Sequence, residues 1–227
     1  PIEYQAALLT YEAGNTEKLI EYIDETRQMK IKVLPPDVNE SGEDFTPVYT
    51  SRAGAKAGAK QPRDGFIRFG LTAIRGVGEK AVEAIVAERK KNGPFKNLYD
   101  FCDRLDTRIV NKSTIDALIR CGAMTSLHDN RAAMLHALDG AYEASHRARL
   151  DKESGQNLLF GGGDTSSSSS SATPDTPMPK VPEFGKPDLL AMEKELLGFY
   201  VSSHPLLDRQ NEVESFGSFT TKSAQQQ

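Results

Sequence analysis

Hydrophobic residues recur at the spacing of a buried helical face along most of the chain. One stripe has apolar side chains at i, i+3, i+4 and i+7, the pattern of an amphipathic helix: Leu98, Phe101, Cys102 and Leu105. The same periodicity predicts helices over residues 3–11, 79–92, 98–105, 113–121, 130–149 and 189–199, and one that begins at Thr16. A shorter apolar face, Leu71 and Ile74, stops at Gly76. We therefore expect a mostly α fold.

Two kinds of segment interrupt the helical pattern. Ile31 and Val33 alternate with lysines and predict a short strand before a Pro-Pro pair, so a short α/β piece precedes the later helices. Residues 39–65 are rich in glycine, proline and charge, which indicates a loop whose tip is basic: Arg52, Lys56, Lys60 and Arg63. Residues 151–187 contain a run of six serines, together with glycines and prolines, and predict a disordered linker.

Charge is distributed unevenly along the chain. The net charge is -4, yet residues 66–122 carry 11 basic and 7 acidic side chains, a local net charge of +4. A basic middle in an acidic chain is where a polyanion would bind. An ordinary solvated surface would give the same count, so charge alone leaves both interpretations open.

Composition excludes several classes of protein. The chain has no run of 18 apolar residues, so we expect no membrane partner. Its cysteines, Cys102 and Cys121, fall on predicted helices, which indicates reduced thiols and a cytoplasmic location. The histidines have no metal-ligand spacing with either cysteine, so we expect no metal site in this segment. The carboxylates of Asp103, Asp106 and Asp116 are scattered over predicted helical surfaces, so we expect no catalytic residue and no cofactor either.

Gly76, Val77 and Gly78 join two apolar segments and predict a helix-hairpin-helix motif. Glycine permits positive φ and lets the backbone come close to a ligand. The helix that follows begins at once, so its free N–H groups make an anion site that suits a phosphate. Arg75 and Lys80 flank the turn and add charge. The alternative is an ordinary turn that happens to contain glycine.

The helices over 98–105 and 113–121 would form a second hairpin that lacks glycines. Ser113 and Asp116 make a candidate capping box for its second helix. Two hairpins related by a pseudo-twofold axis would straddle a minor groove and grip the sugar-phosphate backbone without reading sequence. The second turn would offer four polar side chains to the opposite DNA strand, unless they are merely solvated: Arg108, Asn111, Lys112 and Ser113.

Five ordered blocks carry a family resemblance: ALLTYEAGNTEKLIEYIDETRQMKIKVLPPDVNES, IRFGLTAIRGVGEKAVEAIV, GPFKNLYDFCDRLD, NKSTIDALIRCGA and EKELLGFYVSSHPL. Together they resemble the alpha subunits of bacterial DNA polymerase III, the C-family of replicative polymerases. The resemblance implies four parts: the end of the fingers domain with an inserted basic loop (1–64), a tandem helix-hairpin-helix DNA-binding domain (65–150), a flexible linker (151–187), and a helix and connector toward an absent OB-fold (188–227).

The resemblance also implies an activity and partners. Full-length members of this family are DNA-directed DNA polymerases, that is, nucleotidyltransferases. Their catalytic aspartates and Mg²⁺ belong to a palm domain upstream of this segment, so we expect the segment alone to be inactive. The implied partners are primer-template duplex, the sliding clamp and other subunits of the holoenzyme.

An apolar triplet in the predicted linker matches a further family feature. The sequence QNLLF at residues 156–160 resembles the clamp-binding peptide Q-x-x-(L/M)-F of these subunits. The resemblance implies that Gln156 bonds backbone at a pocket rim while Leu159 and Phe160 fill an apolar pocket on the clamp. Leu158 departs from the small or acidic residue often found third in the motif. The alternative is that the triplet folds back onto the preceding helix.

Two functions of different class remain open from the sequence. The first is a segment that binds duplex DNA and the sliding clamp. The second is a helix-hairpin-helix segment that binds other proteins without touching DNA. The acidic composition, with a pI near 5.7, and the glycine-free second hairpin favour the latter.

Overall fold

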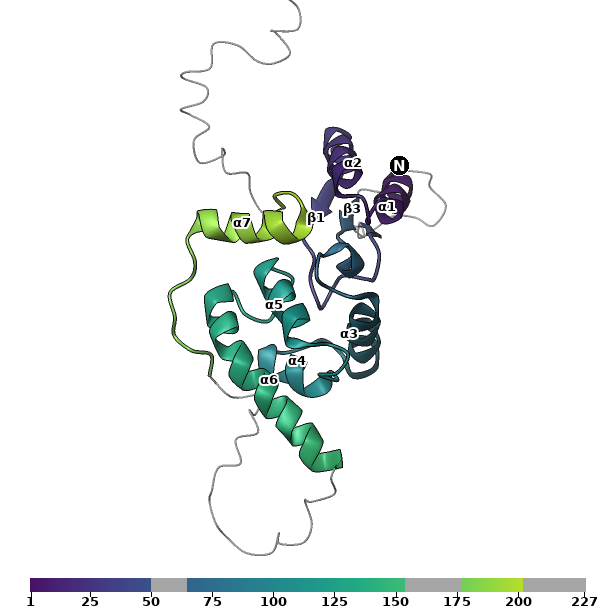
Figure 1. The fold of residues 1–227 in the computed structure, drawn as a ribbon. Helices are drawn as coiled ribbons and strands as arrows, with labels where there is room; N and C mark the ends of the chain where they lie inside the picture. The colour runs from purple at the N-terminus through teal and green to yellow at the C-terminus, as the bar shows by residue number, and fades with distance from the viewer. Residues whose placement is uncertain (50–64, 154–176, 202–227) are drawn as a thin grey trace, which may run out of the picture.

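The computed structural model describes residues 1–49, 65–153 and 177–201, and this part is mostly helical, as predicted (Figure 1). Its α-helices are α1 (Ile2–Tyr11), α2 (Thr16–Gln28), α3 (Glu79–Asn92), α4 (Leu98–Arg104), α5 (Lys112–Arg120), α6 (Arg131–Glu153) and α7 (Lys186–Leu197). No helix within these ranges is both long enough and apolar enough to cross a membrane. The helices lie close to their predicted positions, because their buried faces follow the helical period.

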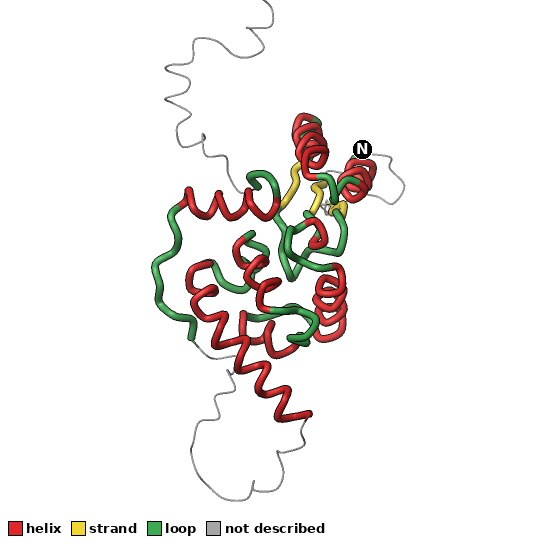
Figure 2. Tube along the Cα trace, in the orientation of Figure 1, coloured by secondary structure: helices red, strands yellow, loops and turns green. Residues whose placement is uncertain are grey.

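A small sheet lies beside α1 and α2 at one end of the structure (Figure 2). Its strands, in the spatial order β1-β3-β2, are β1 (Lys32–Leu34), β3 (Gly65–Arg68) and β2 (Thr46–Tyr49). β3 pairs parallel with β1 and antiparallel with β2. The sequence predicted β1, but the expectation of loop throughout 39–65 was wrong. β2 is an edge strand that contains Pro47, a residue that edge strands tolerate and that argues against a strand in sequence patterns.

Helices α1 and α2 pack against this sheet and against each other. Leu9 of α1 and Leu19 and Ile23 of α2 are at most 2% exposed. α2 begins at Asn15, whose side-chain oxygen accepts a hydrogen bond from the Lys18 N–H at 3.3 Å. The short α/β piece is thus a layer of two helices on three strands in the described part of the chain.

Helices α3 to α6 form the helical body that follows the sheet. Their apolar faces belong to one buried cluster that continues into the α/β piece. α4 and α5 both pack on α6. The segment before α3 is a correction to the expected helix: Leu71–Ala73 forms a single 3₁₀ turn, η1, because Gly70 and Gly76 leave too few residues for an α-helix.

A polar junction ties the loop after β1 to the helical body. The side-chain amide of Asn39 accepts from the Phe95 N–H at 2.8 Å and donates to the Phe95 carbonyl at 2.9 Å. The Asp37 carboxylate accepts from the Ser126 hydroxyl at 3.0 Å, and burial raises the pKa of Asp37. These bonds fix the α/β piece relative to the hairpins.

Residues 177–201 return along the helical body (Figure 1). Burial alone would raise the pKa of Glu183, but the N–H groups of Phe184, Arg131 and Ala132 bond its carboxylate and lower the pKa overall. Because two of these N–H groups open α6, Glu183 caps that helix from 51 or more residues away. This end of the predicted linker is therefore packed against the helical body.

For the last helix the sequence predicts a cap by Asp188 and a buried stripe of Leu189, Met192 and Leu196, and the structure of α7 corrects both. It begins after Gly185, and Asp188 lies in its first turn without capping it. Its buried face is formed by Leu190, Glu193 and Leu197, one position away from the expected stripe of Leu189, Met192 and Leu196. The apolar pattern pointed to the neighbouring face because Glu193 is a charge that the fold buries, at 2% exposed.

Candidate nucleic-acid interface

The turn between η1 and α3, called hairpin 1 here, has the geometry that its glycines allow. Gly76 has φ +82°, in the left-handed region where a side chain is strained. Gly78 is the N-cap of α3, with extended backbone at φ -78° and ψ 149°. Val77 between them is buried, at 7% exposed. The two glycines therefore reverse the chain and start α3 at once.

The first turn of α3 presents backbone donors to solvent. The Gly78 carbonyl accepts from Ala81 and Val82, whereas no acceptor among the described residues bonds the N–H groups of Glu79 and Lys80. Gly78, Glu79 and Lys80 are all exposed. Donors of this kind, at the positive end of the helix dipole, are the groups that bind anions at helix N-termini, and a phosphate at this turn stays a prediction from sequence. Glu79 adds a carboxylate to the same turn. The positive charge of this turn comes from the Lys80 side chain.

Arg75 is placed differently from the other predicted hairpin 1 residues. Its guanidinium donates to the Glu195 carbonyl at 3.2 Å and to the Thr16 hydroxyl at 2.8 Å. Its backbone N–H donates to the Leu196 carbonyl at 3.0 Å. Arg75 thus joins hairpin 1 to the end of α7 and the start of α2, and a phosphate contact by its guanidinium would have to compete with these bonds.

Hairpin 2, formed by α4, the turn over residues 105–111 and α5, starts its second helix with asparagine. The Asn111 side-chain oxygen accepts from the Thr114 N–H at 2.9 Å, so Asn111 is the N-cap. The predicted capping box of Ser113 and Asp116 is therefore wrong, and Ser113 lies exposed in the first turn. Among the described non-glycine residues only Lys30 has a positive φ, so this turn needs no glycine.

The basic side chains of hairpin 2 are exposed and ion-paired. Arg108 is 66% exposed and donates from Nε to Asp106 at 3.3 Å. A bond from the Arg108 backbone N–H and the charge of its side chain lower the pKa of Asp106. Lys112 lies 2.6 Å from Asp139 of α6, and that bond raises the pKa of the lysine. Both pairs are on the surface, where such pairs contribute little stability and exchange readily.

The structure brings the predicted residues together in two groups. Hairpin 1 lies where α3 begins, next to the end of α7, and hairpin 2 lies where α5 begins, beside α6 (Figure 1). The first group holds Arg75, Gly76, Val77, Gly78 and Lys80, and the second holds Arg108, Asn111, Lys112 and Ser113.

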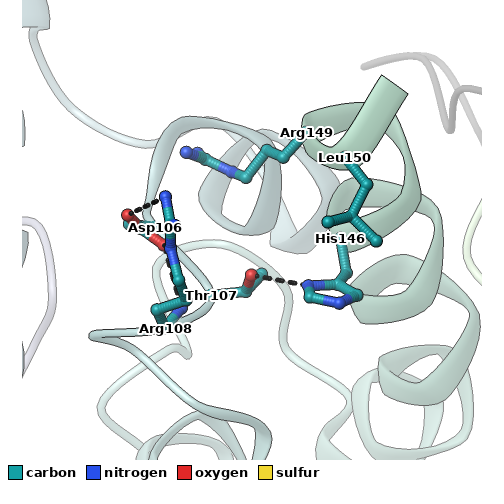
Figure 3. Close-up of a pocket in the computed structure, with 6 residues that line it drawn as sticks. All are labelled: Asp106, Thr107, Arg108, His146, Arg149 and Leu150. Carbon is teal, nitrogen blue, oxygen red and sulfur yellow. Dashed lines mark hydrogen bonds and ion pairs between the residues drawn. The ribbon is translucent and has the colours of Figure 1, made fainter. Parts of the chain in front are cut away.

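Sequence reasoning missed residues of α6 that lie behind hairpin 2. A small pocket there is lined by Asp106, Thr107, Arg108, His146, Arg149 and Leu150 (Figure 3). The Thr107 hydroxyl and His146 Nδ1 lie 3.1 Å apart, and the Tyr142 hydroxyl donates to the Thr107 carbonyl at 2.9 Å. The turn and α6 are far apart in sequence, so no local pattern could have joined them.

Known proteins resemble both the motif and the whole chain. A family model described as a helix-hairpin-helix motif matches residues 30–134, which include both hairpins. The DNA polymerase III subunit alpha of Pseudomonas aeruginosa is 37% identical over 95% of this chain. The subunits of the same name from Saccharopolyspora erythraea and Deinococcus radiodurans are 38% and 36% identical, each over 91% of it. The chain belongs to the DNA polymerase III alpha-subunit family. It spans only 18%, 16% and 14% of the lengths of these three relatives.

The alpha-subunit motif expected to bind the sliding clamp lies outside the described residues. Gln156, Leu158, Leu159 and Phe160 fall in the range 154–176. The basic tip of the loop before β3 also falls outside. The clamp assignment therefore stays a prediction from sequence.

The acidic and thiol groups of this alpha-subunit segment occupy structural positions. Asp116 pairs with Arg120 at 2.6 Å, and Asp106 holds Arg108. Within the described ranges no three His, Cys, Asp or Glu side chains are grouped as metal ligands. Burial raises the pKa of both Cys102 and Cys121 to about 12, which makes these thiols poor nucleophiles.

Proposed function

We propose that this chain is the part of a DNA polymerase III alpha subunit that holds duplex DNA by its phosphate backbone. The observation that carries the proposal is the start of α3, where Gly76 has φ +82° and the exposed N–H groups of Glu79 and Lys80 have no acceptor among the described residues. A phosphate oxygen would accept from these N–H groups while Lys80 neutralises its charge. Hairpin 2 would hold the opposite strand through Arg108, Lys112 and the first turn of α5.

The proposal places polymerisation elsewhere in the longer subunit. DNA synthesis would use carboxylates and Mg²⁺ outside this segment, together with other holoenzyme subunits. We expect the 227-residue chain to extend no primer in the presence of Mg²⁺ and deoxynucleotides. Primer extension followed on a denaturing gel tests this, and extension by pure chain would contradict it.

Charge reversal at the hairpins tests DNA binding. We expect Lys80→Glu and Lys112→Glu together to abolish binding to a labelled duplex, because each reversal replaces a phosphate partner with a repelling charge. Lys32→Glu, an exposed lysine of β1 outside both hairpins, is the matched control. Circular dichroism would establish that all variants are folded. Equal loss in the control, or full binding by the hairpin variant, would contradict the proposal.

We also propose that residues 156–160 dock on the sliding clamp. Burying Leu159 and Phe160 in an apolar pocket would contribute roughly 3–6 kcal/mol before ordering costs. Such a peptide binds weakly alone, and simultaneous attachment to DNA supplies the avidity. Surface plasmon resonance against the cognate clamp should show binding that Gln156→Ala with Phe160→Ala removes. Asn157→Ala, at an unspecified position of the motif, should bind like the wild type; equal binding by all three would exclude the motif.

The second candidate is a protein-interaction segment without DNA contact. The observation that favours it is Arg75, whose guanidinium already bonds the Glu195 carbonyl and the Thr16 hydroxyl. A hairpin tip that packs within the protein is typical of a structural role. Absence of duplex binding by the folded wild-type chain at low salt would favour this candidate.

A further inference from the structure

The pocket behind hairpin 2 lies in the proposed DNA-binding region, and the hairpin motif does not explain its presence. It has a volume of about 30 Å³ and lies between the turn residues 106–108 and the second half of α6 (Figure 3). A space of this size holds about one water molecule or one oxygen atom of a larger group.

One buried donor in the pocket lining has no acceptor. Arg149 donates from Nη2 to the Asp103 carbonyl at 2.7 Å, which fixes the side chain beside the turn. Its Nε is buried and has no hydrogen-bond partner in the described part of the protein. Buried N–H groups almost always have an acceptor, and leaving one unpaired is costly. Arg149 is among the residues that line the pocket, so an oxygen atom that enters the pocket lies beside this cation.

The charge around the pocket favours an anion. Arg108 and Arg149 contribute two positive charges, against one from the Asp106 carboxylate, so these three groups sum to +1. Asp106 receives three bonds from Arg108, from its backbone N–H and from Nε and Nη2, and thereby holds that guanidinium at the pocket. Arg108 nevertheless remains 66% exposed, and its cation can meet a ligand that approaches from solvent.

We propose that Arg108 and Arg149 together form a seat for one backbone phosphate of the bound duplex, so that α6 extends the grip of hairpin 2. This inference rests on the proposed DNA-binding function. A phosphate oxygen would enter the pocket and accept from Arg149, while the exposed Arg108 neutralises the group from outside. Arg149 is then a DNA-contact residue that lies outside both hairpin motifs.

The test is the salt dependence of duplex binding by the 227-residue chain. Each neutralised phosphate contributes about -0.9 to the slope of log K against log salt concentration. We expect Arg149→Gln to weaken binding roughly threefold to tenfold and to make the slope shallower by about 1. Arg149→Lys should restore the slope, because it keeps the charge. The matched control is Arg147→Gln, an exposed arginine two residues away on another face of α6, which should bind like the wild type.

A double-variant cycle distinguishes one shared seat from two separate contacts. If Arg108 and Arg149 hold the same phosphate, Arg108→Gln with Arg149→Gln should lose less affinity than the product of the single losses. Losses that multiply would overturn the shared seat. An Arg149→Gln slope equal to that of the wild type would overturn the inference while leaving the hairpin function intact.

Two further outcomes would contradict the proposed function or the assignment of the pocket to DNA. Absence of duplex binding by the folded wild type would refute the proposed function itself, and the inference with it. Inorganic phosphate should not bind the chain measurably by calorimetry, because the seat needs the rest of the duplex to supply affinity. Saturable phosphate binding that Arg149→Gln abolishes would instead show an independent anion site and overturn the assignment to DNA.

Discussion

One buried ion pair joins α7 to the helical body. Glu193 is 3% exposed in its side chain and lies 2.7 Å from Nη2 of Arg131, which is 13% exposed. The same guanidinium donates to the Arg120 carbonyl at 3.0 Å and packs on Gly122, where an added Cβ would lie 2.5 Å from Nη2. Removing the charge of Glu193 would therefore leave the Arg131 guanidinium without its carboxylate partner and without room to take another position.

The expected cost follows from that burial. Breaking a buried pair by removing one partner typically costs about 3–5 kcal/mol, because the remaining charge is uncompensated. Glu193→Gln keeps an oxygen acceptor, and Arg131 keeps its bond to Arg120, so we expect a loss of about 2–4 kcal/mol in the free energy of unfolding. Glu195→Gln, an exposed neighbour on α7, should change it by less than about 0.5 kcal/mol.

Urea unfolding followed by circular dichroism, with linear extrapolation, measures both variants. Replacing the pair by apolar residues, Arg131→Met with Glu193→Leu, should recover most of the loss because no buried charge then remains. If Glu193→Gln unfolded at the same urea concentration as Glu195→Gln, the pair would contribute nothing and α7 would be held by other contacts.

Three other perturbations have defined outcomes. The pKa of Glu183 is lower in the folded than in the unfolded chain, so its carboxylate stabilises the fold above its ordinary pKa of 4.5. This contribution is lost as the pH falls through the folded pKa. Between pH 7 and pH 3, urea unfolding should therefore show a larger loss in the free energy of unfolding for the wild type than for Glu183→Gln. Cys102 and Cys121 should resist iodoacetamide at pH 8 until the chain unfolds, as mass spectrometry would show; rapid native labelling would contradict their burial. Gly76→Ala should lower the free energy of unfolding by about 1 kcal/mol because of its positive φ, whereas Gly140→Ala, within α6 and with open space at its Cβ, should raise it; an equal effect of the two would contradict the strained turn.

Local patterns in the sequence were sufficient for the buried face of α4 and for the glycine turn of hairpin 1. Leu98, Phe101 and Leu105 are at most 3% exposed, as their spacing predicted. Gly76 and Gly78 take the backbone conformations that a tight start to α3 requires. In both cases the deciding interactions lie within one or two turns of chain, so periodicity and residue type report them directly.

Interactions between distant residues were not predictable in this way. Glu193 and Arg131 are 62 residues apart, and Arg75 lies 120 residues from Glu195. In the sequence, each of these charged residues has the pattern of a solvated surface residue. Their partners come close only because the chain folds back along the helical body. Arg149 was missed for the same reason, because its neighbours in the pocket come from the turn of hairpin 2.

The measurement that tests the central claim most directly is binding of the chain to two duplexes of unrelated sequence across a range of salt concentrations. Fluorescence anisotropy gives the affinity for each. We expect equal affinities and a linear fall of log K with log salt concentration, with about -0.9 in slope for each phosphate held. Absence of binding at low salt, or a strong preference for one sequence, would contradict the claim that the hairpins hold the DNA backbone.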